Sequence, residues 1–262
     1  MRPLLIVTLA LAGLLIGPWL RALVFRYSVL AGESPRQACP ACGHQILSGR
    51  PAWLPAWSAV RVFGRCPRCA AAVGPPRLTI ELTSAFLLGL LAARIQPGLL
   101  LTAYCFLAVC AVPLAYTDAS VRRLPNALTG PAYVGTLLIL ILAAASGGQW
   151  HSLARAALGG LVLAACYLII AFISPAAVGG GDRRLSASVG TALAWSGWDT
   201  LLAGVFAGFL LAGVYGIALL AARRGGLRQH IPFGPFMIAG MFLVILASPA
   251  FQAVSVPGAH LS

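Results

Sequence analysis

The stretch VGGGDRRL, residues 178–185, places one acid between two long apolar segments of the chain. Acids are scarce here, since the 262 residues include only five Asp and Glu. A carboxylate at hydrocarbon depth costs roughly 2.5–3.5 kcal/mol on insertion scales, so an acid retained there indicates function. The glycines before it would let the backbone enter the membrane edge without helical geometry, where protein or water covers it. We therefore expect Asp182 to belong to a site built from more than one membrane segment.

The composition is that of an all-α polytopic membrane protein. Hydrophobic residues make up 60% of the chain, charged residues make up 9%, and the mean hydropathy is +0.92. A soluble domain of this size has no need of so much apolar surface. We expect about eight transmembrane helices, over 4–24, 79–93, 99–115, 127–145, 153–173, 186–198, 201–222 and 232–247. The first segment is too long for a cleaved signal peptide, and the sixth is the weakest of the eight.

Arginine supplies all of the positive charge, because the chain has no lysine and carries a net charge of +13. With eight spans, the loops 26–78, 116–126, 174–185 and 223–231 fall on one side of the membrane. That side holds fourteen arginines, against three on the other side. The positive-inside rule makes the arginine-rich side cytoplasmic. Topology thus explains the charge, so we expect a lipid bilayer and no nucleic acid as a partner.

The long polar loop contains a predicted metal site. Its four cysteines form two C-x-x-C pairs separated by twenty-three residues: Cys39 with Cys42, and Cys66 with Cys69. Such pairs can place four thiolates around one structural Zn²⁺, and Arg65 and Arg68 would favour the thiolate form. Two disulfides are the alternative, which the reducing cytoplasm disfavours. His44 is a second candidate ligand, but we interpret it as a surface histidine.

Asp118 lies in the segment AYTDASVRRLPN, residues 115–126, on the same predicted side as Asp182. Two carboxylates brought together cannot both ionise easily. One keeps its proton while the other activates water, as in aspartic proteases. The alternative is that each acid caps a helix or pairs with the two arginines that follow it. Asp199 falls on the opposite side, where we interpret it as a helix cap. The matched settings of Asp118 and Asp182 favour a catalytic pair.

Four motifs in this order resemble those of the bacterial type IV prepilin peptidases, which are membrane aspartic proteases of the G-x-G-D type. GGGDRRL at 179–185 is similar to the family's G-x-G-D-x-K-L, with Arg184 in the lysine position. Asp118 followed by LPN at 124–126 resembles D-x5-L-P-N. The paired cysteines resemble the family's cytoplasmic zinc-binding domain, and IPFGPF at 231–236 matches a late signature that opens the last span.

The resemblance implies an activity. The substrate would be a prepilin or pseudopilin with a short basic leader, a glycine before the cut and an apolar helix after it. Asp118 and Asp182 would act as general acid and base on water, at the cytoplasmic face of the bacterial inner membrane. Gly179, Gly180 and Gly181 would form the active-site loop. Neither the order of the two roles nor an oligomeric state follows from the sequence.

The resemblance also divides the chain into three parts: 1–25 as the first transmembrane helix, 26–78 as the cytoplasmic zinc module associated with methyl transfer, and 79–262 as a seven-helix peptidase domain. Many members of the family also methylate the new N-terminus with S-adenosylmethionine. Arg26 and Glu81 fit that pattern, and we expect Glu81 to stay solvated. Arg21, however, stands where the family carries asparagine, and SGRPAW at 48–53 lacks an expected acid or amide. The sequence leaves methylation, and with it S-adenosylmethionine, open.

Two other classes of protein share some of these features. A transporter also uses intramembrane acids and glycine-broken helices, as an ion site. It predicts acids deeper in the spans and gives no reason for four paired cysteines. A membrane-anchored zinc scaffold with inactive catalytic sites would explain the cysteines but not the two aspartates.

Overall fold

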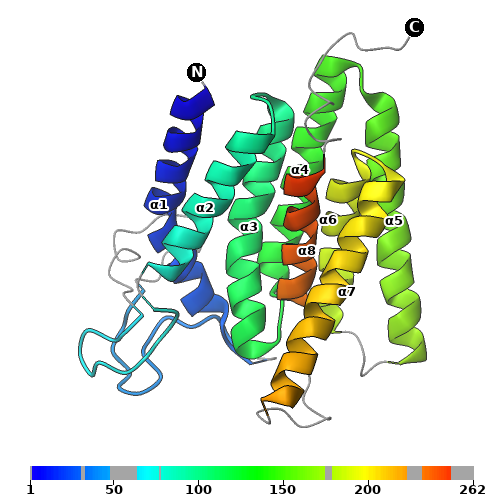
Figure 1. The fold of residues 1–262 in the computed structure, drawn as a ribbon. Helices are drawn as coiled ribbons and strands as arrows, with labels where there is room; N and C mark the ends of the chain where they lie inside the picture. Colours follow the sequence, from blue (N-terminus) through cyan, green and yellow to red (C-terminus); the bar gives the residue numbers. More distant parts are fainter. Residues whose placement is uncertain are drawn as a thin grey trace, which may run out of the picture.

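The computed structural model describes residues 2–30, 33–47, 64–76, 78–174, 179–222 and 232–248. Within these ranges it forms eight α-helices that run alongside one another in a single bundle (Figure 1). The all-α prediction is therefore confirmed. The helices are α1 Arg2–Tyr27, α2 Thr79–Arg94, α3 Leu99–Val121, α4 Asn126–Gly147, α5 Trp150–Ile173, α6 Gly180–Ala194, α7 Trp198–Ala221 and α8 Gly234–Ala247.

Five of these helices are long and apolar enough to cross a membrane: α1, α3, α4, α5 and α7. The other three are shorter, with 16 residues in α2, 15 in α6 and 14 in α8. Each of the eight predicted segments overlaps mainly with one helix, and the largest shift is in the sixth, predicted at 186–198 and found at Gly180–Ala194. The chain is thus a multi-pass helical membrane protein, while the count of eight spans stays a prediction.

Glycines allow neighbouring helices to approach closely. A Cβ added to Gly13 of α1 would lie 2.7 Å from the Cα of Ala85 in α2. A Cβ added to Gly190 of α6 would lie 2.5 Å from the carbonyl oxygen of Gly159 in α5. The backbones of α7 and α8 also approach closely at a pair of glycines. Small residues at helix contacts are typical of membrane bundles, where close backbone packing replaces a hydrophobic driving force.

The helix α6 is an interior element, which explains why its sequence was the weakest span. It contacts α4, α5, α7 and α8, and Ser186, Ser188 and Thr191 are buried among them. Because protein rather than lipid covers it, α6 does not need an apolar surface. Its C-terminal end is held by Arg155 of α5, which donates to the carbonyls of Ala194 at 2.8 Å and of Trp195 at 2.6 Å.

The structure corrects the predicted boundaries around both aspartates. The helix α3 continues through Asp118 to Val121, and α6 begins at Gly180, so both acids lie on helices rather than in loops. The expectation that the glycines before Asp182 avoid helical geometry is wrong for Gly180 and Gly181. A Cβ at Gly181 would lie 2.5 Å from that of Leu124, so glycine is needed there because another segment packs closely against the helix.

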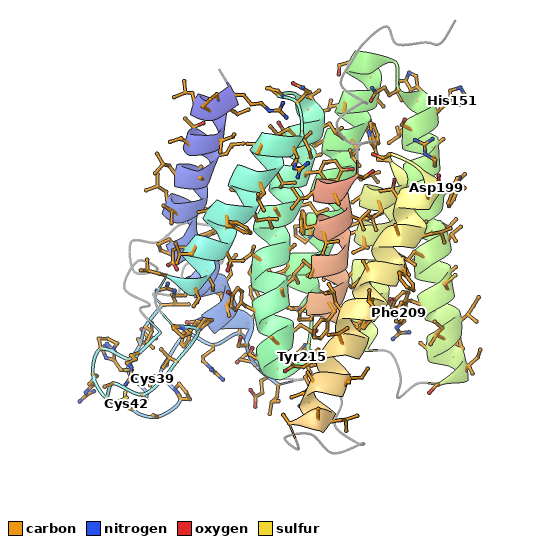
Figure 2. All side chains as sticks on the ribbon, in the orientation of Figure 1. Cys39, Cys42, His151, Asp199, Phe209 and Tyr215 are labelled. Carbon is orange, nitrogen blue, oxygen red and sulfur yellow. The ribbon has the colours of Figure 1, made fainter. Side chains whose placement is uncertain are left out.

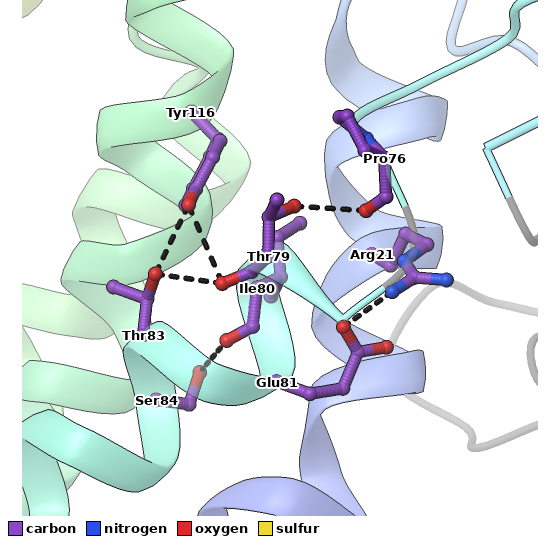
Figure 3. A network of polar contacts seen from close by, with 8 residues as sticks. All are labelled: Arg21, Pro76, Thr79, Ile80, Glu81, Thr83, Ser84 and Tyr116. Carbon is purple, nitrogen blue, oxygen red and sulfur yellow. Dashed lines mark hydrogen bonds and ion pairs between the residues drawn. The ribbon is translucent and has the colours of Figure 1, made fainter.

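A buried ion pair joins α1 to α2 (Figure 3). Arg21 contacts the carboxylate of Glu81, and the two residues are only 3% and 6% exposed. The expectation that Glu81 stays solvated is therefore wrong. Gly17 makes room for the pair, because a Cβ there would lie 2.5 Å from Cγ of Glu81. Breaking a buried pair by removing one partner typically costs about 3–5 kcal/mol, so Arg21 and Glu81 depend on each other.

Candidate functional site

The two predicted aspartates line one cavity of about 420 Å³. Asp118 enters it from the last turn of α3, and Asp182 from the first turn of α6. The rest of the wall comes from the end of α3, its connection to α4 and the first residue of α4, from Gly179 and the first turns of α6, and from Leu30 beyond the end of α1. The two carboxylates are close enough for their charges to interact. The fold therefore brings together two acids that are 64 residues apart in sequence.

Asp118 is held by the N-terminus of α8. Its Oδ2 accepts a hydrogen bond of 3.1 Å from the backbone amide of Gly234, the first residue of that helix, and Asp118 is 4% exposed. The free amides and the dipole at a helix N-terminus favour a negative charge. A Cβ on Gly234 would lie 2.7 Å from Oδ2 of Asp118, so only glycine fits without a shift.

This contact gives a role to the late IPFGPF motif, which the sequence had placed only at the start of the last span. Ile231 lies outside the described residues, whereas Pro232 to Phe236 are within them. A glycine between prolines at a helix start is a signal of close backbone approach. The sequence did not show that the approaching group is the carboxylate of Asp118.

The neighbouring arginines do not pair with the two aspartates. Among the described residues, neither acid forms an ion pair with the two arginines that follow it. Arg123 donates instead to the carbonyl of Leu30 at 2.7 Å, and Arg184 donates to the side-chain oxygen of Asn126. The structure therefore does not support the alternative in which Asp118 and Asp182 serve local ion pairs.

Asp199 lies away from this cavity. Figure 2 shows it with His151 at the end of the bundle opposite Cys39 and Cys42. The N-cap of α7 is Gly197, without a side-chain capping bond, so the prediction that Asp199 caps the helix is wrong. Asp199 lies in the first turn, where an acid interacts favourably with the helix dipole.

The four paired cysteines form a cluster that could hold a metal ion. Their Sγ atoms all lie within 4.8 Å of one another, with 3.7 Å between Cys39 and Cys69 and 3.6 Å between Cys42 and Cys66. Four sulfurs at about 2.3 Å from a tetrahedral zinc lie about 3.8 Å apart, so the donor set fits this metal. A disulfide requires about 2.05 Å, and all four cysteines are free.

The two cysteine pairs share one backbone conformation. The amide of Cys39 donates to His44 and its carbonyl accepts from Gly43; likewise the amide of Cys66 donates to Ala71 and its carbonyl accepts from Ala70. Gly43 and Ala70 are both left-handed, with φ of 68° and 55°. This conformation turns each loop back so that its two sulfurs face the same point.

The local environment favours a thiolate at Cys66. Hydrogen bonds from the backbone amides of Cys69 and Arg68 lower the pKa of the Cys66 thiol to about 6. At Cys42 the amide of His44 also favours the thiolate, but burial and hydrogen bonds with the other thiols outweigh it and raise the pKa to about 12. The thiols of Cys42 and Cys66 therefore do not ionise together by themselves, and a bound cation would displace the proton from Cys42.

Comparison with known proteins identifies the family. The Type IV leader peptidase family matches residues 105–217, and the bacterial peptidase A24 N-terminal domain matches residues 11–95. Together these matches include both aspartates and all four paired cysteines. No solved structure matches the chain.

The chain is also similar to proteins named prepilin leader peptidase/N-methyltransferase. It is 30% identical to the one from Aeromonas salmonicida (strain A449), over 84% of this chain and 73% of that protein. The one from Pseudomonas aeruginosa is 31% identical over 81% and 71%, and the one from Burkholderia pseudomallei (strain K96243) is 36% identical over 79% and 65%. This chain belongs to the type IV prepilin peptidase family and is a peptidase.

The contact between Gly234 and Asp118 can be tested with one methyl group. Gly234→Ala is expected to lower peptidase activity about 10- to 100-fold, because the Cβ displaces the carboxylate or the start of α8. Gly213→Ala is the matched control, since a Cβ there meets nothing within 4 Å. Cleavage rates in detergent give the comparison. Full activity in Gly234→Ala would show that Asp118 does not need this position.

Proposed function

We propose that this protein is an aspartic endopeptidase of the bacterial inner membrane that removes the short basic leader from type IV prepilins or pseudopilins. The observation that carries the proposal is the shared cavity of Asp118 and Asp182, with two acids from different helices and no ion pair to either among the described residues. The family's peptidase activity requires an acid and a base, and this pair supplies both.

Hydrolysis by such a pair needs one proton shared between two carboxylates. The ionised acid takes a proton from water as the oxygen attacks the scissile carbonyl, and the protonated acid donates to that carbonyl oxygen. The proton taken from water is then delivered to the leaving amine, while one hydroxyl of the tetrahedral intermediate returns a proton to the other carboxylate. The two groups titrate as a pair, so the Gly234 amide fixes the geometry of Asp118 without alone assigning its role.

The proposed placement of the active site on the cytoplasmic side rests on the distribution of arginines between the loops. The proposed cytoplasmic loops carry fourteen arginines against three. In the structure, the cysteine cluster lies at one end of the bundle and Asp199 at the other (Figure 2). A basic leader that has not crossed the membrane would reach a cavity on the cytoplasmic side. The transporter alternative is weaker, because both acids lie at helix ends rather than at mid-membrane depth.

We also propose that the cysteine cluster is a structural zinc site in a cytoplasmic module, 26–78, between the first helix, 1–25, and a peptidase domain, 79–262. Four thiolates leave no open position for catalysis, so the zinc would stabilise the fold. Cys39 and Cys66 pack with Ala22 and Phe25 of α1, which connects the cluster to the membrane bundle.

The proposal does not include N-methylation, although the names of the relatives contain it. The carboxylate of Glu81 is already engaged by Arg21 inside a helix pair, and residues 48–53 lie outside the described residues. Of the two described residues that fit the family's methyl-transfer pattern, Arg26 and Glu81, Glu81 is therefore not free to hold S-adenosylmethionine. We therefore derive no step through that cofactor.

Replacing either aspartate with asparagine tests the peptidase proposal. Asp118→Asn and Asp182→Asn keep the side-chain shape but remove an acid, so each is expected to lower cleavage of a co-expressed prepilin by at least about 10³-fold. Asp199→Asn, at the other end of the bundle, is the control and should cleave normally. The processed fraction on a gel measures the effect. Normal cleavage by either Asp118→Asn or Asp182→Asn would remove that acid from the mechanism.

Metal analysis of purified protein tests the zinc proposal. The wild type is expected to hold about one zinc per chain, because four thiolates complete one tetrahedral site. Cys39→Ser and Cys69→Ser should lose the metal. Cys105→Ser and Cys166→Ser lie outside the cluster and should retain it. A zinc content that is equal in all five proteins would contradict the assignment.

A further inference from the structure

A long apolar groove lies beside the candidate active site. It has a volume of about 720 Å³ and is lined mainly by α1, α3 and α4. One wall is a single face of α1 that runs from Leu9 to Tyr27. At a rise of 1.5 Å per residue this wall is about 27 Å long, close to the ~30 Å thickness of the hydrocarbon core. The groove is therefore long enough to accept an apolar helix across most of a bilayer.

The groove adjoins the cavity of the two aspartates at two places on the chain. On α4, Asn126 lines the cavity while the next residues, Ala127 and Leu128, line the groove. On the other side, Tyr27 lines the groove and Leu30 lines the cavity. A chain that leaves the cavity toward the membrane interior would therefore enter the groove.

The continuity of the groove with the cavity favours a protein occupant over a lipid chain. Only a chain that passes through the cavity of the two aspartates would lie in both the cavity and the groove.

We propose that this groove is the docking site for the apolar helix that follows the cleavage site of the substrate. The inference rests on the proposed function and adds the path of the substrate. The order of the parts of a prepilin agrees with the order of the cavity and the groove in the enzyme. The leader would lie outside the membrane, the scissile bond in the cavity, and the apolar helix in the groove along α1, α3 and α4. The groove would thus select a helix by its length and apolar face.

Filling the groove tests the proposal in a kinetic assay. Ala12 lines the groove, and Ala157 is exposed on α5, outside the groove lining. Ala12→Trp is expected to lower kcat/KM for a full-length prepilin at least tenfold, mainly through a higher KM, because the indole occupies the place of the substrate helix. Ala157→Trp makes the same change on the surface of another helix and should leave kcat/KM unchanged.

Photocrosslinking with the same two positions separates docking from structural damage. A benzophenone side chain placed at Ala12 is expected to capture the co-expressed prepilin, and one at Ala157 is expected not to. If the prepilin is still cut, two kinds of result overturn the groove proposal. The first is capture of prepilin at neither position or equally at both. The second is capture at Ala12 of phospholipid only or of a second enzyme copy only. If the wild type does not cut the prepilin at all, the proposed function fails, and this inference fails with it.

Discussion

The hydrogen bond from the Gly234 amide to the buried carboxylate of Asp118 is the constraint on which the site depends. It joins the end of α3 to the beginning of α8, two elements separated by more than a hundred residues. A carboxylate at this depth needs a donor, and a helix N-terminus supplies one without adding a counter-charge. Asp118 is thereby positioned while remaining free of a salt bridge among the described residues, as an acid–base pair requires.

Close backbone contacts between other helices also help to position the two acids. Gly181 lets α6 pack against Leu124, which lies in the connection between α3 and α4, shortly after Asp118 in the chain. Gly159 and Gly190 bring α5 against α6, and this keeps α6 inside the protein. Because α6 carries Asp182 in its first turn, the packing of α6 sets the position of the second acid relative to the first.

The sequence predicted the helical segments, the clustering of the four cysteines and the two aspartates as candidate site residues. Each has a local signal: apolar length, C-x-x-C spacing, or an acid in an acid-poor chain. Apart from the pairing of Asp118 with Asp182, the sequence did not predict features that depend on which segments become neighbours. The pairing of Arg21 with Glu81, the contact of Gly234 with Asp118 and the helical state of Gly180 all arise from packing between distant elements. The low hydropathy of α6 made it the weakest predicted span for the same reason, since its cover is protein and not lipid.

The central claim is that Asp118 and Asp182 work as one unit, and a double-mutant cycle tests it most directly. Cleavage rates of a prepilin would be compared for Asp118→Asn, Asp182→Asn and the double variant. If the two acids form one catalytic pair, the double variant should be no slower than either single variant, because either change already removes the mechanism. If each single variant keeps partial activity and the losses multiply in the double variant, the two acids act independently and the account is wrong.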